Sequence, residues 1–248
     1  MKKLVLAYSG GLDTSYCLKT LSQEGYEVHA VSVNTGGFIP KEIEEQESKA
    51  MLMGAHSYKS INALESFYQK IVKYLVFGNV LKNNSYPLSV SAERIVQAVE
   101  IIEYAKKTDA KFIAHGSTGA GNDQVRFDLI FQVLAPTIEI ITPIRDQQLS
   151  REDEIEYLKN QGIEMSWEKA QYSINQGLWG TSVGGSETLT SRKALPNEAY
   201  PSPLLETNPT KIRLKFEGGE LIELNGKKAD AVMLIQELQD LAKTYAIG

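Results

Sequence analysis

The chain has 248 residues, of which 42% are hydrophobic and 23% are charged. This composition lies far from that of disordered chains, and the length allows one large domain or one domain with part of a second. The 26 basic and 31 acidic residues give a net charge of −5 and are mixed along the chain. No basic patch of the kind that binds nucleic acid is therefore indicated.

The sequence also argues against membrane and thiol chemistry. No apolar run approaches the roughly 18 residues of a membrane span, and the N-terminus becomes polar too early for a signal peptide. We therefore expect a cytoplasmic protein without a membrane partner. The single cysteine, Cys17, excludes an intramolecular disulfide, a cysteine-built metal site and sulfur transfer between two thiols. No set of metal-ligating residues is predicted.

Short β-branched runs alternate with helical patterns from Lys3 to about Gly162, which is typical of a parallel sheet covered on both faces. The expected fold is α/β, with a doubly wound, mostly parallel sheet. The expected strands are Lys3–Tyr8, Glu27–Val33, His56–Ser60, Lys111–His115 and Glu139–Thr142.

Helices are expected between these strands. The first runs from Leu12 to Gln23 and ends at Gly25, and the second runs from Pro40 to Gly54. A third helix is expected to begin with an N-cap at Asn62 and to include the apolar residues Phe67, Ile71, Tyr74 and Leu75. Another is indicated by an apolar stripe at Ile95, Ala98, Val99, Ile102 and Ala105. A Ser150–Asp153 capping box opens a further helix that ends at Gly162.

The pattern changes after Gly162. Tyr172 to Pro209 is rich in Gly, Ser, Thr, Asn and Pro, and a connection of this length is either functional or mobile. Lys211–Phe216 and Glu220–Leu224 alternate around Gly218-Gly219 and predict a hairpin. A last helix is expected from the apolar stripe Ala231, Leu234, Ile235, Leu238, Leu241 and Tyr245.

A glycine-rich loop joins the first strand to the first helix, with the sequence Ser9-Gly10-Gly11-Leu12-Asp13-Thr14-Ser15. The glycines allow a close backbone approach, and the helix N-terminus attracts phosphate. Asp13 beside a phosphate is best explained by a cation such as Mg²⁺. The alternative is a tight turn in which Asp13 only complements the helix dipole.

This loop resembles the PP-loop of the ATP pyrophosphatases, whose pattern is Ser-Gly-Gly-x-Asp-Ser/Thr. The resemblance implies the adenine nucleotide alpha hydrolase-like fold. It also implies that the loop holds the β- and γ-phosphates of ATP, with reaction at the α-phosphate and release of pyrophosphate. Neither the Walker pattern nor the dinucleotide-binding glycine pattern is present.

A second loop follows the fourth expected strand and spans His115 to Phe127. Asp123 and Arg126 are three residues apart and share a helix face, so they suit the ammonium and carboxylate groups of a free amino acid. The alternative is an intrahelical ion pair beneath an Asn122 cap.

The two loops together resemble the argininosuccinate synthase family. Three shorter motifs follow in the order expected for that family: Tyr86-Pro87-Leu88-Ser89-Val90-Ser91, Tyr172-Ser173 and Leu178-Trp179-Gly180-Thr181-Ser182. The resemblance implies that the ureido oxygen of citrulline attacks the α-phosphate of ATP to give citrullyl-AMP. The amine of aspartate then displaces AMP and forms argininosuccinate.

The resemblance also assigns residues. Ser9, Asp13 and Asp123 are expected to carry the reaction. The ATP site is expected to contain Ala7, Tyr8, Ser9, Gly10, Gly11, Leu12, Asp13, Thr14, Ser15, Val33 and Gly116. Aspartate is assigned to Thr118, Asn122 and Asp123, and citrulline to Tyr86, Ser91, Asn122, Arg126, Ser173 and Ser182. For Tyr86 and the serines the unaided sequence indicates only ordinary loop hydrogen bonds.

Two domains and an assembly are implied as well. Residues 1–165 are expected to form the nucleotide-binding domain, and residues 166–248 part of an α+β synthetase and oligomerisation domain. A homo-oligomer is expected, since the family forms tetramers.

Several features depart from the family pattern. Ala120 stands where the family usually has Lys. Two segments, Asn34-Thr35-Gly36-Gly37 and Asn175-Gln176-Gly177, also differ from the commonest family sequence. The family continues beyond the position of Gly248, with a Glu and a Tyr of the citrulline pocket and a helix used in assembly. Alternatives are therefore a catalytically incomplete ATP-binding remnant, or another PP-loop enzyme such as a tRNA-thiolating or amidating one.

Overall fold

The computed structural model describes residues 2–119, 121–163 and 172–247. The chain groups into two compact units. Among the described residues, the first unit contains residues 2–34, 38–63 and 94–163, and the second contains residues 35–37, 64–93 and 172–247. Each unit is described separately below.

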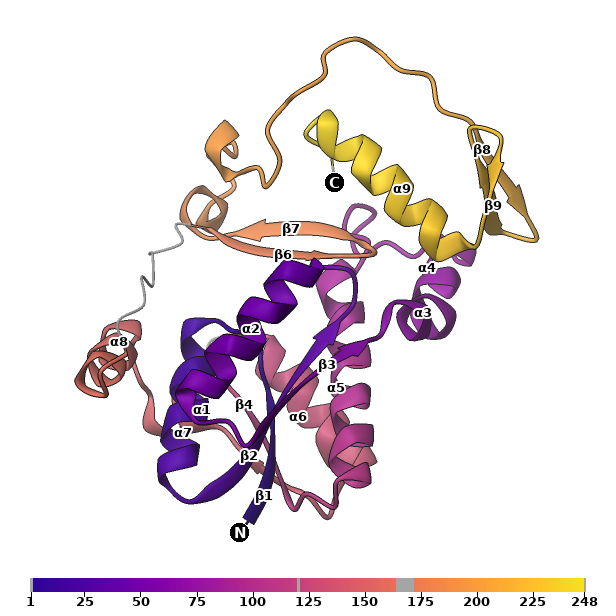
Figure 1. The fold of residues 1–248 in the computed structure, drawn as a ribbon. Coiled ribbons are helices and arrows are strands. Elements are labelled where there is room, and N and C mark those ends of the chain that lie inside the picture. Colours follow the sequence, from indigo (N-terminus) through magenta and orange to yellow (C-terminus); the bar gives the residue numbers. More distant parts are fainter. Residues whose placement is uncertain (1, 120, 164–171, 248) are drawn as a thin grey trace. The chain divides into compact units, whose positions relative to one another are not determined.

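The first unit is built on a five-stranded sheet with the order β3-β2-β1-β4-β5 (Figure 1). All four neighbouring pairs are parallel. The strands are β1 (Lys2–Ala7), β2 (Tyr26–Asn34), β3 (Ser57–Asn62), β4 (Phe112–His115) and β5 (Glu139–Ile141). Each of the five expected strands is confirmed to within two residues at its ends.

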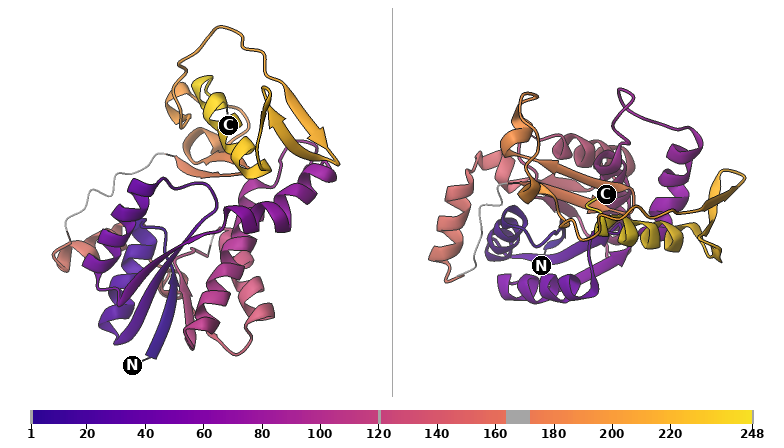
Figure 2. Two further views of the ribbon diagram at one scale, coloured as in Figure 1. Left: turned by 45° about the vertical axis from the view of Figure 1, so that its right-hand side comes forward. Right: turned by 90° about the horizontal axis from the view of Figure 1, so that it is seen from above.

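Helices cover both faces of this sheet, which confirms the doubly wound arrangement. Figures 1 and 2 show α1 and α2 on one face and α5 and α6 on the other. The helices are α1 (Leu12–Gln23), α2 (Pro40–Met53), α5 (Ser89–Lys107), α6 (Asp123–Leu134), α7 (Pro143–Gln147) and α8 (Arg151–Asn160). No helix of the described residues is long and apolar enough to cross a membrane.

The core follows from the alternation of the strands. Leu4 and Leu6 of β1 are fully buried in one cluster with Leu18 of α1 and Leu158 of α8. Successive side chains of a strand point to opposite faces, so each buried strand needs apolar residues at every position. This requirement explains the continuous β-branched runs in the sequence.

Most helix boundaries match the expected ones. Gly25 and Gly54 follow α1 and α2 with φ of +86° and +100°, the left-handed conformation that glycine adopts readily. Two details differ from the expected ones. Asn62 is the last residue of β3, and the next helix begins two residues later, at Leu64. Ile95 is exposed, because α5 turns Val96 and not Ile95 into the core.

The second unit contains short helices, hairpins and a C-terminal helix. Its elements are α3 (Leu64–Phe67), a π-helical turn (Tyr68–Val72), α4 (Lys73–Phe77), β6 (Ser173–Gly177), β7 (Gly180–Gly184), two 3₁₀ turns (Ser186–Leu189 and Asn197–Ala199), β8 (Leu214–Glu217), β9 (Glu220–Leu224), β10 (Lys227–Lys228) and α9 (Ala231–Thr244). The expected third helix is thus interrupted by the π-helical turn.

The two hairpins differ in how well the sequence predicts them. The expected hairpin around Gly218-Gly219 is confirmed as β8 and β9, and Leu234 of α9 packs on Leu221 and Leu224. The antiparallel pair β6 and β7 lies in the segment that the sequence analysis interprets only as a functional or mobile connection. Its Ser-, Asn- and Gly-rich strands lack apolar alternation.

The predicted domain boundary between residues 165 and 166 lies outside the described residues and stays a prediction. Residues 35–37 and 64–93, which precede it in sequence, group with the second unit.

The capping box of α8 provides a test of the fold. Asp153 N–H donates to Ser150 Oγ at 3.2 Å, and Ser150 N–H donates to the Asp153 carboxylate at 2.9 Å. We expect Ser150→Ala to lower the free energy of unfolding by about 1 kcal/mol, because it removes the acceptor of the Asp153 N–H and the hydroxyl that donates to the Asp153 carboxylate at 2.6 Å. Urea denaturation measures this change. Ser150→Thr keeps the hydroxyl and should stay close to wild type; equal losses in both variants would contradict the capping role.

Candidate functional site

The two glycine-rich loops meet at one edge of the parallel sheet. The first loop follows β1 and the second follows β4, and these strands are parallel neighbours that pair Ala7 with His115. After β1 the chain crosses to β2 on one side, whereas after β4 it crosses to β5 on the other side. Such a switch point outside the carboxyl ends of the strands is where open α/β sheets bind ligands.

The first loop is organised by its own hydroxyl groups. Ser9 Oγ and Thr14 Oγ1 lie 3.2 Å apart, and Thr14 Oγ1 also donates to the Gly11 carbonyl at 3.2 Å. The Gly11 N–H donates to Ser9 Oγ at 3.4 Å. Gly10 has a φ of +76°, which an L side chain rarely adopts. Hydrogen bonds between its own hydroxyl and backbone groups therefore hold the loop in this conformation.

The N-terminus of α1 has no side-chain cap. Its N-cap residue is Gly11, which has no side chain that could accept from the first turn. First-turn N–H groups and the helix dipole favour an anion at such an end. Asp13 lies in this first turn and complements the dipole as well. The geometry thus fits a phosphate cradle, and it equally contains the tight turn of the alternative interpretation.

The second loop approaches the first so closely at Gly116 that any side chain there would require its neighbours to shift. A Cβ atom built on Gly116 would lie 3.1 Å from the backbone carbon and from Cβ of Asp13, and 3.2 Å from the backbone nitrogen of Thr14. Both segments are backbone at this point, so neither yields easily. Gly116 therefore fixes the spacing of the two loops, and its assignment to the nucleotide site is compatible with this place.

Glu154, a buried acid that no sequence motif marks, lies beside Asp13. Glu154 is only 2% exposed on α8, which packs against α1. Burial of this carboxyl, the negative charge of Asp13 and a hydrogen bond with Asp13 raise the pKa of Glu154 to about 8. Near neutral pH Glu154 holds its proton, so it positions Asp13 without adding a second negative charge.

A cavity of about 230 Å³ adjoins the first loop. Its lining residues are Ser9, Gly10, Phe38, Glu42, Glu45, Gln46 and Lys49. Gln46 is buried against Gly10 and accepts from the Tyr58 hydroxyl at 3.0 Å. Lys49 contributes a cation to this cavity. Neither Gln46 nor Lys49 has a local sequence signal, because both approach the loop only through the packing of α2.

His115 anchors the second loop to α6. Its Nε2 lies 2.8 Å from Asp128 Oδ1, and its Nδ1 accepts from the Ser117 N–H at 3.2 Å. The Ser117 contact requires an unprotonated Nδ1, so Nε2 is the donor to Asp128. The His115 hydrogen bond and the Arg145 ion pair lower the pKa of Asp128 despite burial. This network attaches the start of the second loop to α6.

Asp123 is held between two arginines. Arg126 Nη1 donates to Asp123 Oδ1 at 2.6 Å, and Arg94 Nε donates to Asp123 Oδ2 at 3.0 Å. The expected Asp123–Arg126 pairing on one helix face is therefore present, as the intrahelical ion pair of the alternative interpretation. Arg94 of α5 has no sequence signal that links it to Asp123.

Other residues assigned to aspartate are open to ligand. Thr118 and Asn122 are exposed. Asn122 occupies the N-cap position of α6 but makes no side-chain cap hydrogen bond there, so this part of the alternative interpretation is not confirmed. Ala120 lies outside the described residues.

The remaining assigned residues occupy ordinary structural positions. The Tyr86 hydroxyl accepts from the Val90 N–H at 3.1 Å in the first turn of α5. Ser91 lies in the same turn, and Ser182 pairs with Asn175 between β7 and β6. Ser173 begins β6. These four residues belong to the second unit, whereas Asn122 and Arg126 belong to the first. The citrulline assignment stays a prediction, as do those of Ala7, Tyr8 and Val33.

The two segments that differ from the commonest family sequence, near residues 35–37 and 175–177, lie close to each other. Leu178 N–H donates to the Thr35 carbonyl at 2.9 Å. A Cβ atom on Gly37 would lie 2.2 Å from the Gln176 carbonyl oxygen, and one on Gly36 would lie 2.8 Å from the Leu178 nitrogen. Glycine at both positions thus permits the close approach of the β6–β7 hairpin.

Comparison with known proteins resolves the family. The family model of the argininosuccinate synthase N-terminal HUP domain matches residues 3–164. The chain belongs to this family. Curated argininosuccinate synthases are similar along the whole chain: 38% identity to that of Methanocaldococcus jannaschii and 36% to that of Sulfurisphaera tokodaii, over 98% and 99% of this chain. The chain spans 62% and 63% of the length of these relatives.

A solved structure supports the fold alone. A crystal structure of a 4-thiouridine synthetase–RNA complex with bound ATP is similar over 65% of this chain and 41% of the chain in that structure. The TM-score is 0.50 and the sequence identity is 15%. The likeness agrees with the α/β fold of the argininosuccinate synthase HUP domain described above.

The contact at Gly116 gives a prediction for this argininosuccinate synthase family member. Gly116→Ala should lower the free energy of unfolding by about 1–3 kcal/mol, because the new methyl group overlaps the Asp13 backbone. It should also weaken ATP binding. Urea denaturation and calorimetric titration with ATP measure the two effects. Gly119→Ala is the matched control, since its nearest atom would be Arg145 Cγ at 3.7 Å; equal behaviour of the two variants would refute the spacing role.

Glu154 gives a pH-dependent prediction. Its pKa is about 8 in the folded protein against a reference of 4.5, so its contribution to stability is fully present below about pH 4.5 and is lost as pH rises to 8. Glu154→Gln stays neutral, so the variant should match wild type near pH 5 and exceed its free energy of unfolding by about 2–4 kcal/mol near pH 9.

Chemical denaturation across this pH range tests the effect, with exposed Glu156→Gln as the control. The Glu156 variant should follow the wild-type curve at every pH. Parallel curves for wild type and Glu154→Gln would show that Glu154 is not held protonated.

Proposed function

We propose that this chain carries the ATP-dependent condensation of L-citrulline with L-aspartate to argininosuccinate, with release of AMP and pyrophosphate. The observation that carries the proposal is the contact between the phosphate loop and the second loop at Gly116 and Asp13, in a chain of the argininosuccinate synthase family. The contact places an anion cradle beside polar groups suited to an amino acid.

The proposed reaction has two steps. The ureido oxygen of citrulline attacks the α-phosphorus of ATP and expels pyrophosphate, which gives citrullyl-AMP. The α-amino nitrogen of aspartate then attacks the activated ureido carbon, loses its proton and expels AMP with the former ureido oxygen. Activation is needed because that oxygen is a poor leaving group until it is bonded to phosphorus.

The chain's own residues supply binding and orientation. We assign the ATP phosphates to Ala7–Ser15, with Gly116 against the nucleotide and the backbone near Val33 against adenine. In-line attack at phosphorus depends mainly on positioning and on charge stabilisation. The Ser9 and Thr14 hydroxyls and the N-terminus of α1 offer both.

Mg²⁺ fits the donors of the phosphate loop. Asp13, Ser9 and Thr14 present carboxylate and hydroxyl oxygens, which are the ligand types that Mg²⁺ prefers. We propose that these residues hold it together with the ATP phosphates, and that Mg²⁺ when bound reduces the negative charge on the phosphates.

The amino-acid site is assigned to the second loop and to the serine motifs. Thr118, Asn122 and Asp123 are proposed to hold aspartate. Citrulline is assigned to Tyr86, Ser91, Asn122, Arg126, Ser173 and Ser182. Because Asp123 already bridges Arg94 and Arg126, aspartate binding requires one of these ion pairs to open or to share its oxygens with the ligand ammonium.

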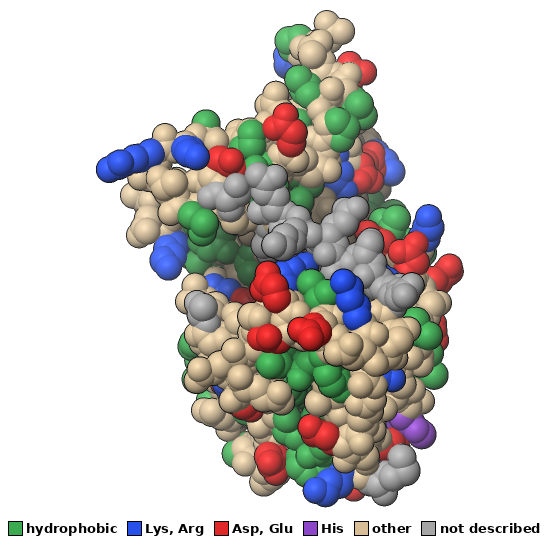
Figure 3. Space-filling model, turned by 90° about the vertical axis from the view of Figure 1, so that its left-hand side faces the viewer, with side chains coloured by type: hydrophobic (Ala, Val, Ile, Leu, Met, Phe, Trp, Pro, Cys, Tyr) green, Lys and Arg blue, Asp and Glu red, His purple; other side chains and the backbone are tan. Residues whose placement is uncertain are grey.

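Other PP-loop chemistries have less support. Burial of Cys17 raises the pKa of its thiol, so this group is a poor nucleophile for sulfur transfer. On the face drawn in Figure 3, Lys and Arg side chains are scattered among Asp and Glu side chains. A homo-oligomeric assembly and a cytoplasmic location remain expectations that accompany the ligase proposal.

Pyrophosphate release tests the proposal. The purified chain should release pyrophosphate and AMP when ATP, Mg²⁺, citrulline and aspartate are all present, and far less when citrulline is omitted. Since the chain spans 62% of the length of its relative from Methanocaldococcus jannaschii, ATP binding is measured separately by calorimetry. ATP binding without citrulline-dependent release would identify a catalytically incomplete nucleotide-binding chain.

Asp13→Asn separates the role of the loop from that of the fold. It keeps the shape of the side chain but removes the charge, so turnover should fall by about 100-fold or more while the chain stays folded. Asp240→Asn, at an exposed position of α9, is the control and should keep wild-type turnover. Wild-type turnover in Asp13→Asn would show that the loop is misinterpreted.

A further inference from the structure

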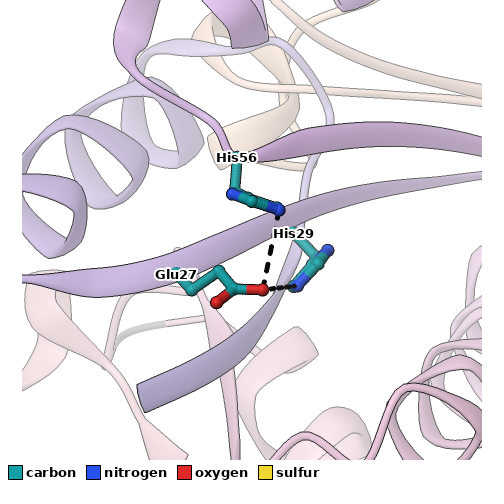
Figure 4. A group of neighbouring side chains, drawn as sticks. All are labelled: Glu27, His29 and His56. Atoms are coloured by element: carbon teal, nitrogen blue, oxygen red, sulfur yellow. Dashed lines mark hydrogen bonds and ion pairs between the residues drawn. The ribbon is translucent and has the colours of Figure 1, made fainter. Parts of the chain in front are cut away.

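Two of the three histidines of the chain meet one carboxylate at the start of β2 and β3. Figure 4 shows Glu27, His29 and His56 with their polar atoms turned toward one another. Glu27 and His29 are two residues apart on β2 and so lie on the same face of the sheet. His56 directly precedes β3, and its N–H donates to the Val28 carbonyl at 2.8 Å. Strand pairing therefore fixes all three backbone positions.

The donor atoms have the spacing of a metal site. Glu27 Oε1 lies 3.2 Å from His29 Nε2 and 3.6 Å from His56 Nε2, and the three ligand atoms all lie within 4.8 Å of one another. A tetrahedral zinc ion with bonds of about 2.0–2.1 Å requires its ligand atoms to be about 3.3–3.4 Å apart. Small side-chain rotations therefore suffice to bring the three atoms around one ion.

His29 also has the outer partner that metal-ligating histidines commonly have. Its Nδ1 lies 2.7 Å from Ser57 Oγ, on the residue that pairs with it across β2 and β3. A hydrogen bond at Nδ1 fixes the ring orientation and directs Nε2 toward Glu27.

Burial differs among the three ligands. The side chains of His29 and Glu27 are 11% and 17% exposed, whereas that of His56 is 54% exposed. An ion bound here would have two enclosed ligands and one solvent-facing ligand, which leaves a fourth position for water. Two imidazoles with one carboxylate suit Zn²⁺, whereas Mg²⁺ and Ca²⁺ prefer oxygen donors alone.

We propose that Glu27, His29 and His56 form a binding site for one Zn²⁺ ion, or for a divalent transition metal of similar preference, with water as the fourth ligand. Lys3 and Val5, the β1 partners of Glu27 and His29, lie before the carboxyl end of β1, whereas the phosphate loop follows that end. The site is therefore separate from the proposed ATP site and does not depend on the proposed function. Its bound ion would connect the start of β2 to the start of β3.

Metal titration of the untagged, chelator-treated chain tests the proposal. Calorimetry with Zn²⁺ should show one ion per chain with a Kd in the micromolar range or tighter, and excess Zn²⁺ should raise the Tm because only the folded chain presents the site. Co²⁺ should give the intense visible absorption of a tetrahedral complex. Binding weaker than millimolar, or an octahedral Co²⁺ spectrum, would overturn the proposal and leave only an ion-pair cluster.

Matched variants locate the ion. His56→Ala removes an exposed ligand and should weaken Zn²⁺ binding at least about tenfold while the chain stays folded. Glu27→Gln should do the same with little change in shape. Glu139→Gln, an exposed acid at the start of β5, is the control and should bind like wild type. Unchanged affinity in both His56→Ala and Glu27→Gln would place any bound Zn²⁺ elsewhere and refute the site.

Discussion

The proposed nucleotide site depends on one close contact between two loops. The absence of a side chain at Gly116 allows the loop after β4 to lie against the backbone of Asp13 and Thr14. This contact lies at the carboxyl edge, where β1 and β4 are neighbours but their following crossovers leave in opposite directions. The phosphate loop, the start of α1 and the second loop therefore share one small region, and every proposed chemical role requires this closeness.

The acidic residues in this region have partners both near and distant in sequence. Asp13 lies beside Glu154, whose pKa is raised so that the pair carries one negative charge near neutral pH. Asp123 is ion-paired with Arg94 and Arg126, whereas Asp128 is ion-paired with Arg145 and hydrogen-bonded to His115. Asp123 and Asp128 thus each have defined partners. Such an arrangement keeps local negative charge low where a triphosphate is proposed to bind.

The sequence predicts much of the first unit because its signals are local. Buried parallel strands require continuous apolar runs, and Gly25, Gly54 and Ser150 mark helix ends through their own backbone or side-chain preferences. The β6–β7 hairpin was missed because strands such as Ser173–Gly177 are polar and glycine-rich. The partnerships of Glu154 with Asp13 and of Arg94 with Asp123 also have no local signal, since tertiary packing alone joins their elements.

The fate of the citrulline ureido oxygen tests the central claim most directly. Citrulline labelled with oxygen-18 at the ureido group would be incubated with the chain, ATP, Mg²⁺ and aspartate, and the AMP analysed by mass spectrometry. Attack of that oxygen on the α-phosphorus predicts one labelled oxygen in the phosphate of each AMP formed. AMP without the label, or no AMP from a folded chain that binds ATP, would contradict adenylation of citrulline at the two-loop site.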